Sequence, residues 1–151
     1  MAQSLSRILV HIIFSTRDRF PFLTDSELRN RMHAYIARVF YEHESPAIKV
    51  GGTEDHVHIL CLLSRNYSVS EIVKKVKANS SSFAKEQGGR CLKFSWQSGY
   101  GAFSIDPSQI DSVQKYIQCQ VDHHRRRTFQ EEYLEILHQY KMAYDERYLW
   151  T

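Results

Sequence analysis

The pattern of apolar and polar residues along the chain predicts several strands. Residues 7–20, RILVHIIFSTRDRF, are dense in β-branched and aromatic residues and end in polar residues before a proline, which is typical of a buried strand. Residues 47–64, AIKVGGTEDHVHILCLLS, predict two short strands around a pair of glycines, the second running from about His56 to Leu63. The aromatic, glycine-interrupted stretch 92–105 predicts a further strand or hairpin.

Two helices are predicted between these strands. The first has apolar residues at helical spacing and begins with Thr24 as its N-cap and Glu27 as capping-box partner. The second begins with a Ser68 and Glu71 capping box and ends on a pair of glycines that suit the left-handed end of a helix.

Two further helices are predicted near the end of the chain. Asp106, followed by a proline and Gln109, has the residues of a cap, a first-turn proline and a capping box, and Thr128 with Glu131 repeats the capping box. The order is therefore βαββαβ followed by C-terminal helices. Because strands and helices do not alternate regularly, we expect an α+β fold, a ferredoxin-like or RRM-like antiparallel sheet with helices on one face.

Composition agrees with a single globular domain over residues 1–151. The chain is 42% hydrophobic and 25% charged, with a net charge of +3. The apolar run ILVHIIF near the start is short and contains a histidine, so we expect neither a signal peptide nor a membrane span. The three cysteines form no CxxC pair, which favours reduced thiols and a cytoplasmic protein, in a bacterial or archaeal cytosol.

The motif DHVHIL holds the first candidate chemistry. Side chains of a strand alternate between two faces, so His56 and His58 should point the same way, opposite to Val57 and Ile59. Two adjacent imidazoles can bind one divalent cation. An isolated His-x-His pair is more often two half-buried polar residues, so a metal site requires a third ligand.

A second group of polar residues lies on the third predicted helix. At about 100° per residue, an apolar stripe should face the sheet, and Tyr116, Gln120 and His123 share a ridge beside it. An ordinary boundary tyrosine would explain Tyr116 alone. Together, however, the ridge offers a nucleophile, a neutral oxygen ligand and a hydrogen-bond donor. The apolar stripe consists of Ile110, Val113, Ile117 and Val121.

These two groups together predict a phosphoryl-transfer reaction. A phenol with a pKa near 10 is only about 0.1% ionised at pH 7, which costs roughly 4 kcal/mol for attack as a phenolate. A divalent ion held by His56, His58 and the Gln120 oxygen could offset this cost and orient a phosphate for attack by Tyr116. Mg²⁺ or Mn²⁺ suits phosphate chemistry. A tyrosine nucleophile keeps the strand attached, so that a 3′-hydroxyl can reseal it.

The motifs HVH and YIQCQVDHH resemble the signature of the single-tyrosine HUH-endonuclease transposases of bacterial insertion sequences, including relatives associated with repetitive extragenic palindromes. The resemblance extends over nearly the whole chain, through VHIIFSTRDR, GGTEDHVHILCLLS, FSWQSGYGAFSID, HHRRRTFQEEYLEIL and YDERYLW. It implies that His56 and His58 are the metal-binding pair, Tyr116 the nucleophile and Gln120 the third ligand. Cys119 departs from the pattern, because many relatives have Asn there.

The same resemblance implies the reaction and the partners. We expect metal-dependent cleavage and strand transfer of single-stranded DNA through a 5′-phosphotyrosine intermediate, and recognition of DNA hairpins at element ends. We also expect a homodimer, in which the tyrosine helix can serve either its own or the partner's His pair. Two alternatives stay open: a domesticated or replication-type nickase that cuts palindromes, and a non-catalytic RRM-like nucleic-acid binder.

Clustered positive residues are the candidate DNA contacts, since lysine and arginine bind phosphates irrespective of sequence. Solvated helix faces would explain the same clusters. Two further pairs of residues are candidate accessories: His123 and His124, for proton transfer or phosphate binding, and Glu54 and Asp55, for a water or a hydrogen bond beside the His pair. The candidate DNA-binding residues are Lys74, Lys77, Arg125, Arg126, Arg127, Arg17 and Arg19.

Overall fold

A four-stranded antiparallel sheet forms the centre of the protein in the computed structural model, which describes residues 2–151. The strands lie in the order β2-β3-β1-β4, and every neighbouring pair is antiparallel. This is the strand order of the ferredoxin-like and RRM-like folds, so the predicted fold class is confirmed. The strands are β1 (Ile8–Ser15), β2 (Ala47–Gly52), β3 (His56–Leu63) and β4 (Gly101–Ile105).

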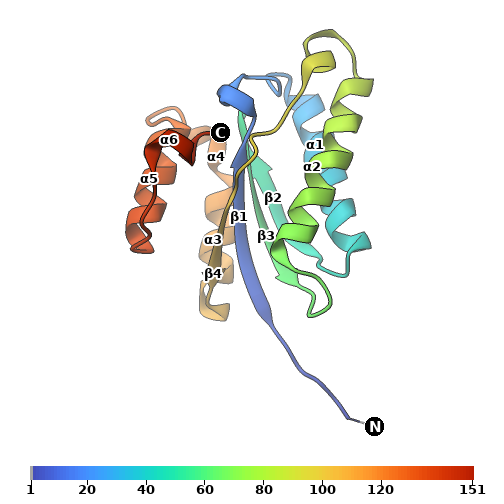
Figure 1. Ribbon diagram of the computed structural model, residues 1–151, viewed down its shortest axis with the longest axis vertical. Helices are drawn as coiled ribbons and strands as arrows, with labels where there is room; N and C mark the ends of the chain where they lie inside the picture. The colour runs from blue at the N-terminus through green and yellow to red at the C-terminus, as the bar shows by residue number, and fades with distance from the viewer. Residues whose placement is uncertain (1) are drawn as a thin grey trace.

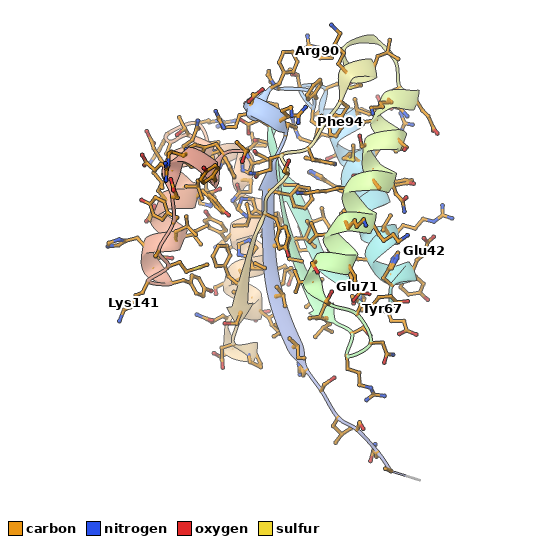
Figure 2. The ribbon with its side chains drawn as sticks, in the orientation of Figure 1. Glu42, Tyr67, Glu71, Arg90, Phe94 and Lys141 are labelled. Atoms are coloured by element: carbon orange, nitrogen blue, oxygen red, sulfur yellow. The ribbon has the colours of Figure 1, made fainter. Side chains whose placement is uncertain are left out.

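Helices α1 (Ser26–Glu42) and α2 (Val69–Glu86) lie side by side on one face of the sheet (Figure 1). The predicted capping box begins α2, and its Glu71 lies at one end of that helix (Figure 2). The predicted cap of α1 is wrong by one residue. Asp25 accepts the hydrogen bond from the first turn, whereas the Thr24 hydroxyl donates to a preceding backbone carbonyl.

The C-terminal helices lie on the opposite side of the sheet (Figure 1). The capping boxes predicted at Asp106 and Thr128 are both present. Short 3₁₀ turns lie between the other elements at Arg17–Arg19, Gly89–Lys93 and Pro107–Gln109. The C-terminal helices are α3 (Ile110–Gln118), α4 (Gln120–His123), α5 (Phe129–Gln139) and α6 (Glu146–Leu149).

Because side chains alternate along β1, the two faces of the sheet belong to two different hydrophobic cores. Ile12 and Phe14 belong to the large core under α1 and α2, whereas Ile13 belongs to a smaller core with Phe129 and Tyr133 of α5. Side chains fill the space between the sheet and the helices on both sides (Figure 2). The second face also carries His11, a polar residue inside a strand that otherwise reads as apolar.

A glycine lets the tyrosine helix approach the sheet closely. Gly51 of β2 pairs with His58, so any side chain at position 51 would point to the face that carries the histidines. A Cβ atom there would lie 2.5 Å from the backbone oxygen of Ile117 and 2.9 Å from its side chain. The absence of a side chain therefore sets the distance between α3 and the sheet.

The third predicted helix is interrupted, and the prediction that Val121 faces the sheet is wrong. Cys119 has φ −96° and ψ 19°, outside the α-helical geometry, and separates α3 from the short α4. Ile117 is buried as predicted, but Val121 is 45% exposed. The angular arithmetic holds only in a continuous helix. After the break, Gln120 rather than Val121 turns inward.

Candidate active site

The two histidines of β3 lie side by side on the face that the C-terminal helices cover. Their register partners on β1 are Ser15 for His56 and Ile13 for His58. Both imidazoles are fully buried, with ring centroids 5.2 Å apart. Val57 turns into the opposite core, as the alternation of the strand predicts.

Each histidine is held by a partner on its Nδ1 atom. His56 Nδ1 lies 2.7 Å from the carboxylate of Asp55 and 2.9 Å from the Thr53 hydroxyl, and His58 Nδ1 lies 2.9 Å from Nε2 of His11. These contacts fix both ring orientations and leave both Nε2 atoms facing the C-terminal helices. Of the two predicted acidic accessories, Asp55 contacts His56, whereas Glu54 is exposed.

The predicted ridge of Tyr116, Gln120 and His123 does come together, although the helix is broken. Gln120 is buried, and its Oε1 lies 3.0 Å from Nε2 of His56. The Tyr116 ring lies 5.8 Å from the His58 ring. The ring of His123 stacks on Tyr116 at 4.9 Å, so this predicted accessory packs against the phenol and holds its orientation.

A residue that sequence reasoning missed, Glu132 of α5, lies at the centre of the site. Its side chain is 1% exposed. One carboxylate oxygen, Oε1, is 2.9 Å from Nε2 of His58, 3.2 Å from Nε2 of His124 and 3.6 Å from Nε2 of His56. The other oxygen accepts hydrogen bonds from the Tyr116 hydroxyl and from the Gln120 amide, the latter at 3.2 Å.

A signal for Glu132 was present in the sequence. Phe129, Tyr133, Ile136 and Leu137 form the apolar stripe of α5, and Glu132 falls on that stripe, three residues after its first member. A carboxylate on the buried face of an amphipathic helix needs a partner, because an isolated buried charge is very costly. The sequence does not say which partner it has.

The electrostatics of the site keep Glu132 ionised and Tyr116 neutral. Burial raises the pKa of Glu132, but hydrogen bonds from His124 and His58 outweigh it and hold that pKa well below the usual range. Burial lowers the pKa of His58 to about 4 and that of His11 to about 3. Burial and the adjacent charge of Glu132 raise the pKa of Tyr116 above its usual value.

The donor atoms fit a divalent cation. One ligand atom each from His56, His58 and Glu132 lies within 4.8 Å of the others, and all three residues are buried. Two imidazoles and one carboxylate are a common ligand set for divalent metals, and Gln120 Oε1 adds a fourth oxygen or nitrogen donor next to His56. The Glu132 carboxylate would strengthen binding of a cation, because the three predicted ligands, His56, His58 and Gln120, carry no charge.

One of the predicted DNA-binding residues reaches the site. The Arg127 guanidinium donates to the Tyr116 hydroxyl, with Nη2 3.2 Å from Oη, and is also paired with Glu135. Arg125 and Arg126 are exposed nearby, and Arg125 lies 3.3 Å from Asp122. Arg127 therefore places a positive charge directly beside the Tyr116 oxygen.

The two predicted lysines lie across the sheet from Tyr116, on α2. Lys74 is exposed. The Lys77 ammonium donates to three backbone oxygens, of Gln97, Ser98 and Gly99, at 2.8, 3.1 and 2.7 Å. Burial lowers the pKa of Lys77 to about 8. These contacts give Lys77 a structural role in holding the segment before β4.

The remaining predicted contacts, Arg17 and Arg19, follow β1 in a 3₁₀ turn. Arg17 is exposed, and the Arg19 guanidinium lies 5.7 Å from the ring centre of Trp150. Arg19 thus packs against the C-terminal segment.

Comparison with known proteins identifies the family. Residues 4–120 match the family described as Transposase IS200 like. The chain belongs to this family. The matched residues include the two histidines, Tyr116 and Gln120, whereas Glu132 lies beyond them. Comparison with curated proteins yields no match.

Two solved structures share the fold of this IS200-like transposase. One, from Deinococcus radiodurans R1 and named a "putative transposase", has a TM-score of 0.62 and 17% identity, over 80% of this chain and 95% of that chain. The other is a REP-associated tyrosine transposase bound to a REP hairpin, with a TM-score of 0.59 and 15% identity, over 82% of this chain and 74% of that chain.

In the described part of the present transposase, none of the helices has the length and apolar character needed to cross a bilayer.

Proposed function

We propose that this transposase cuts and rejoins single-stranded DNA, with Tyr116 as the nucleophile and a divalent ion, Mg²⁺ or Mn²⁺, as cofactor. One observation supports this above all. The Tyr116 hydroxyl, the Arg127 guanidinium and the Glu132 carboxylate converge with the imidazoles of His56 and His58, which come from a distant part of the sequence.

His56, His58 and Glu132 would hold the ion, with Gln120 beside them. Oε1 of Glu132 faces the imidazoles, while Oε2 faces the tyrosine, so a single carboxylate connects the ligands to the nucleophile. When bound, the ion would neutralise charge on the scissile phosphate and make loss of the phenol proton easier. Without the charge of the ion, burial and the adjacent Glu132 carboxylate raise the pKa of Tyr116 and hold the phenol in its protonated form.

The side chains around Tyr116 prepare its oxygen for attack. Glu132 accepts the hydroxyl hydrogen bond and His123 stacks on the ring, so the phenol is oriented from two sides. Arg127 donates to the same oxygen and would stabilise negative charge as it develops there or on the phosphate.

Attack would form a bond from the tyrosine oxygen to phosphorus and break the bond from phosphorus to the 3′-oxygen. The phenol loses one proton and the departing 3′-oxygen gains one. The products are a 5′-phosphotyrosine and a free 3′-hydroxyl. The reverse reaction with another 3′-hydroxyl joins strands without an external energy source.

We further propose that the tyrosine acts in cis, because Tyr116 and the His pair approach each other within one chain. The homodimer stays a prediction, which sedimentation of the purified protein tests. Hairpin recognition is supported by the fold shared with the hairpin-bound REP-associated transposase.

The test is covalent capture of labelled single-stranded DNA that carries hairpins, in Mg²⁺ or Mn²⁺. Wild type should give an adduct that survives denaturation, and Tyr116→Phe should bind DNA without forming one. Cleavage by Tyr116→Phe at the wild-type level would refute the nucleophile. DNA binding without any wild-type adduct would favour the RRM-like binder, and cleavage without joining to an added 3′-hydroxyl would favour the palindrome nickase.

A mixture of two inactive variants tests the cis arrangement. Tyr116→Phe retains the His pair, and His58→Ala retains the tyrosine. If the tyrosine acts in cis, the mixture stays inactive. Recovery of adduct in the mixture would show that the tyrosine of one protomer serves the His pair of another.

A further inference from the structure

We propose that a cavity beside Tyr116 binds one nucleobase, that of a nucleotide directly flanking the scissile phosphate. This inference rests on the proposed function, since it takes Tyr116 as the nucleophile. The cavity has a volume of about 320 Å³, and Tyr116 and Arg127 form part of its lining. That volume is at the small end of the range of about 300–1,000 Å³ for ligand sites, which suits one planar ring.

Apolar side chains from three elements surround this cavity. Ile105 is the last residue of β4, Val113 belongs to α3 and Ile136 belongs to α5, and each is partly exposed. The faces of a nucleobase are apolar and polarisable, and they gain free energy when they leave water for such surfaces. The cavity between α3 and α5 is therefore suited to a flat nucleobase.

Polar groups at the rim match the edge of a base. The side chains of Gln109 and Gln139 both line the cavity, and each primary amide presents a donor and an acceptor side by side. Gln139 is exposed, and Oε1 of Gln109 accepts a capping hydrogen bond from Asp106 at 3.1 Å. Glutamine amides pair with base edges that offer an adjacent donor and acceptor, adenine above all.

The charges of the lining favour a base over a phosphate. The arginine of the lining, Arg127, is paired with the carboxylate of the lining, Glu135, so their charges offset each other. The cavity thus has no net charge to offer a phosphate. The scissile phosphate would instead meet the other guanidinium nitrogen of Arg127, Nη2, which faces away from Glu135 and lies 3.2 Å from the Tyr116 oxygen, and the neighbouring base would enter the cavity.

Two variants test the base site. Gln139→Ala removes an exposed amide at the rim, and Val113→Phe fills the cavity. Gln118→Ala, an exposed glutamine of α3 outside the lining, is the matched control. The substrate is hairpin-bearing single-stranded DNA with randomised bases on both sides of the cleavage point, and the strands attached to the protein are sequenced.

We expect wild type and Gln118→Ala to prefer one base at one flanking position. Gln139→Ala should weaken that preference about 10-fold, within the range for loss of one two-point amide contact. Val113→Phe should lower adduct formation about 10-fold on ordinary DNA but not on DNA with an abasic residue at that position.

Two results would overturn the inference while the proposed function stands. One is an adduct with an unchanged flanking preference in Gln139→Ala. The other is an equal loss on ordinary and abasic DNA in Val113→Phe. Absence of any wild-type adduct would instead refute the proposed function, and this inference with it.

Discussion

Replacement of Glu132 by glutamine tests the residue that only the folded structure brought into the site. The amide keeps the size of the side chain and one oxygen, but it removes the single negative charge that faces both His58 and Tyr116. We expect Glu132→Gln to weaken Mn²⁺ binding strongly. Adduct formation should fall with it, because the remaining candidate ligands are neutral.

The magnitude follows from the charges. Two unit charges about 4 Å apart interact by about 4 kcal/mol at an effective dielectric constant near 20, and a divalent ion doubles this to about 8. Part of that gain is cancelled, because the buried carboxylate costs several kcal/mol to remove from water. A net loss of about 2–4 kcal/mol corresponds to roughly a 30- to 1,000-fold increase in Kd.

The assay is calorimetric titration with Mn²⁺, with electron paramagnetic resonance of the bound ion as a second readout. Glu131→Gln is the matched control: it makes the same change of charge one residue away on α5, and glutamine retains the capping box with Thr128. Equal Mn²⁺ affinities in Glu132→Gln, Glu131→Gln and wild type would refute the assignment of Glu132 as a ligand.

The same variant predicts a pH dependence of stability in the absence of metal. The folded-state pKa of Glu132 is depressed, so its ionised form stabilises the folded protein above the unfolded pKa of about 4.3. This stabilisation is lost as the pH falls through and below that value. In EDTA, the free energy of unfolding of wild type should therefore fall more steeply below about pH 5 than that of Glu132→Gln. The free energies of unfolding are measured by urea denaturation at each pH. An equally steep fall with pH in wild type and Glu132→Gln would contradict this account.

Three further substitutions separate catalysis from folding. Arg127→Ala should lower the rate of adduct formation on the order of 100-fold with unchanged Mn²⁺ affinity, because it removes a hydrogen-bond donor to the nucleophile. The control Arg126→Ala should change the rate little. Equal rates for the two variants in gel assays of the adduct would argue against a role for Arg127. Gly51→Ala should destabilise the fold by about 1–3 kcal/mol in urea, because its Cβ would meet the backbone oxygen of α3 at 2.5 Å, and a wild-type midpoint would exclude that close approach. Lys77→Met should cost about 1–3 kcal/mol of stability, because three backbone oxygens lose their donor, whereas Lys74→Met should not, and the reverse order would disprove the structural role of Lys77.

Most of the fold could be predicted because its signals are local. The capping box of Ser68 and Glu71 and the alternation of β3 each depend on residues a few positions apart, and both appear in the structure. The sequence pattern also put His56 and His58 on one face. The cap at Thr24 was one residue off, since Asp25 offers an equally good oxygen acceptor next to it.

The position of a side chain was not predictable where a break in a helix, the local backbone or a contact with a distant part of the chain decides it. Val121 turned outward because α3 breaks at Cys119, while Gln120 turned inward to meet His56, 64 residues earlier in the sequence. Both Glu54 and Asp55 were candidate accessories, and only Asp55 contacts His56, because backbone geometry at the start of β3 selects between two adjacent carboxylates.

Local patterns in the sequence predicted the βαββαβ order and the His pair, and they placed Tyr116, Gln120 and His123 together although the helix that carries them is interrupted at Cys119. Only the tertiary structure decided that Glu132 joins them, that Arg127 meets the phenol, and that Lys77 serves the fold. The physical reason is that a buried charge is stable only where folding supplies its partners, and those partners lie on other elements of the chain.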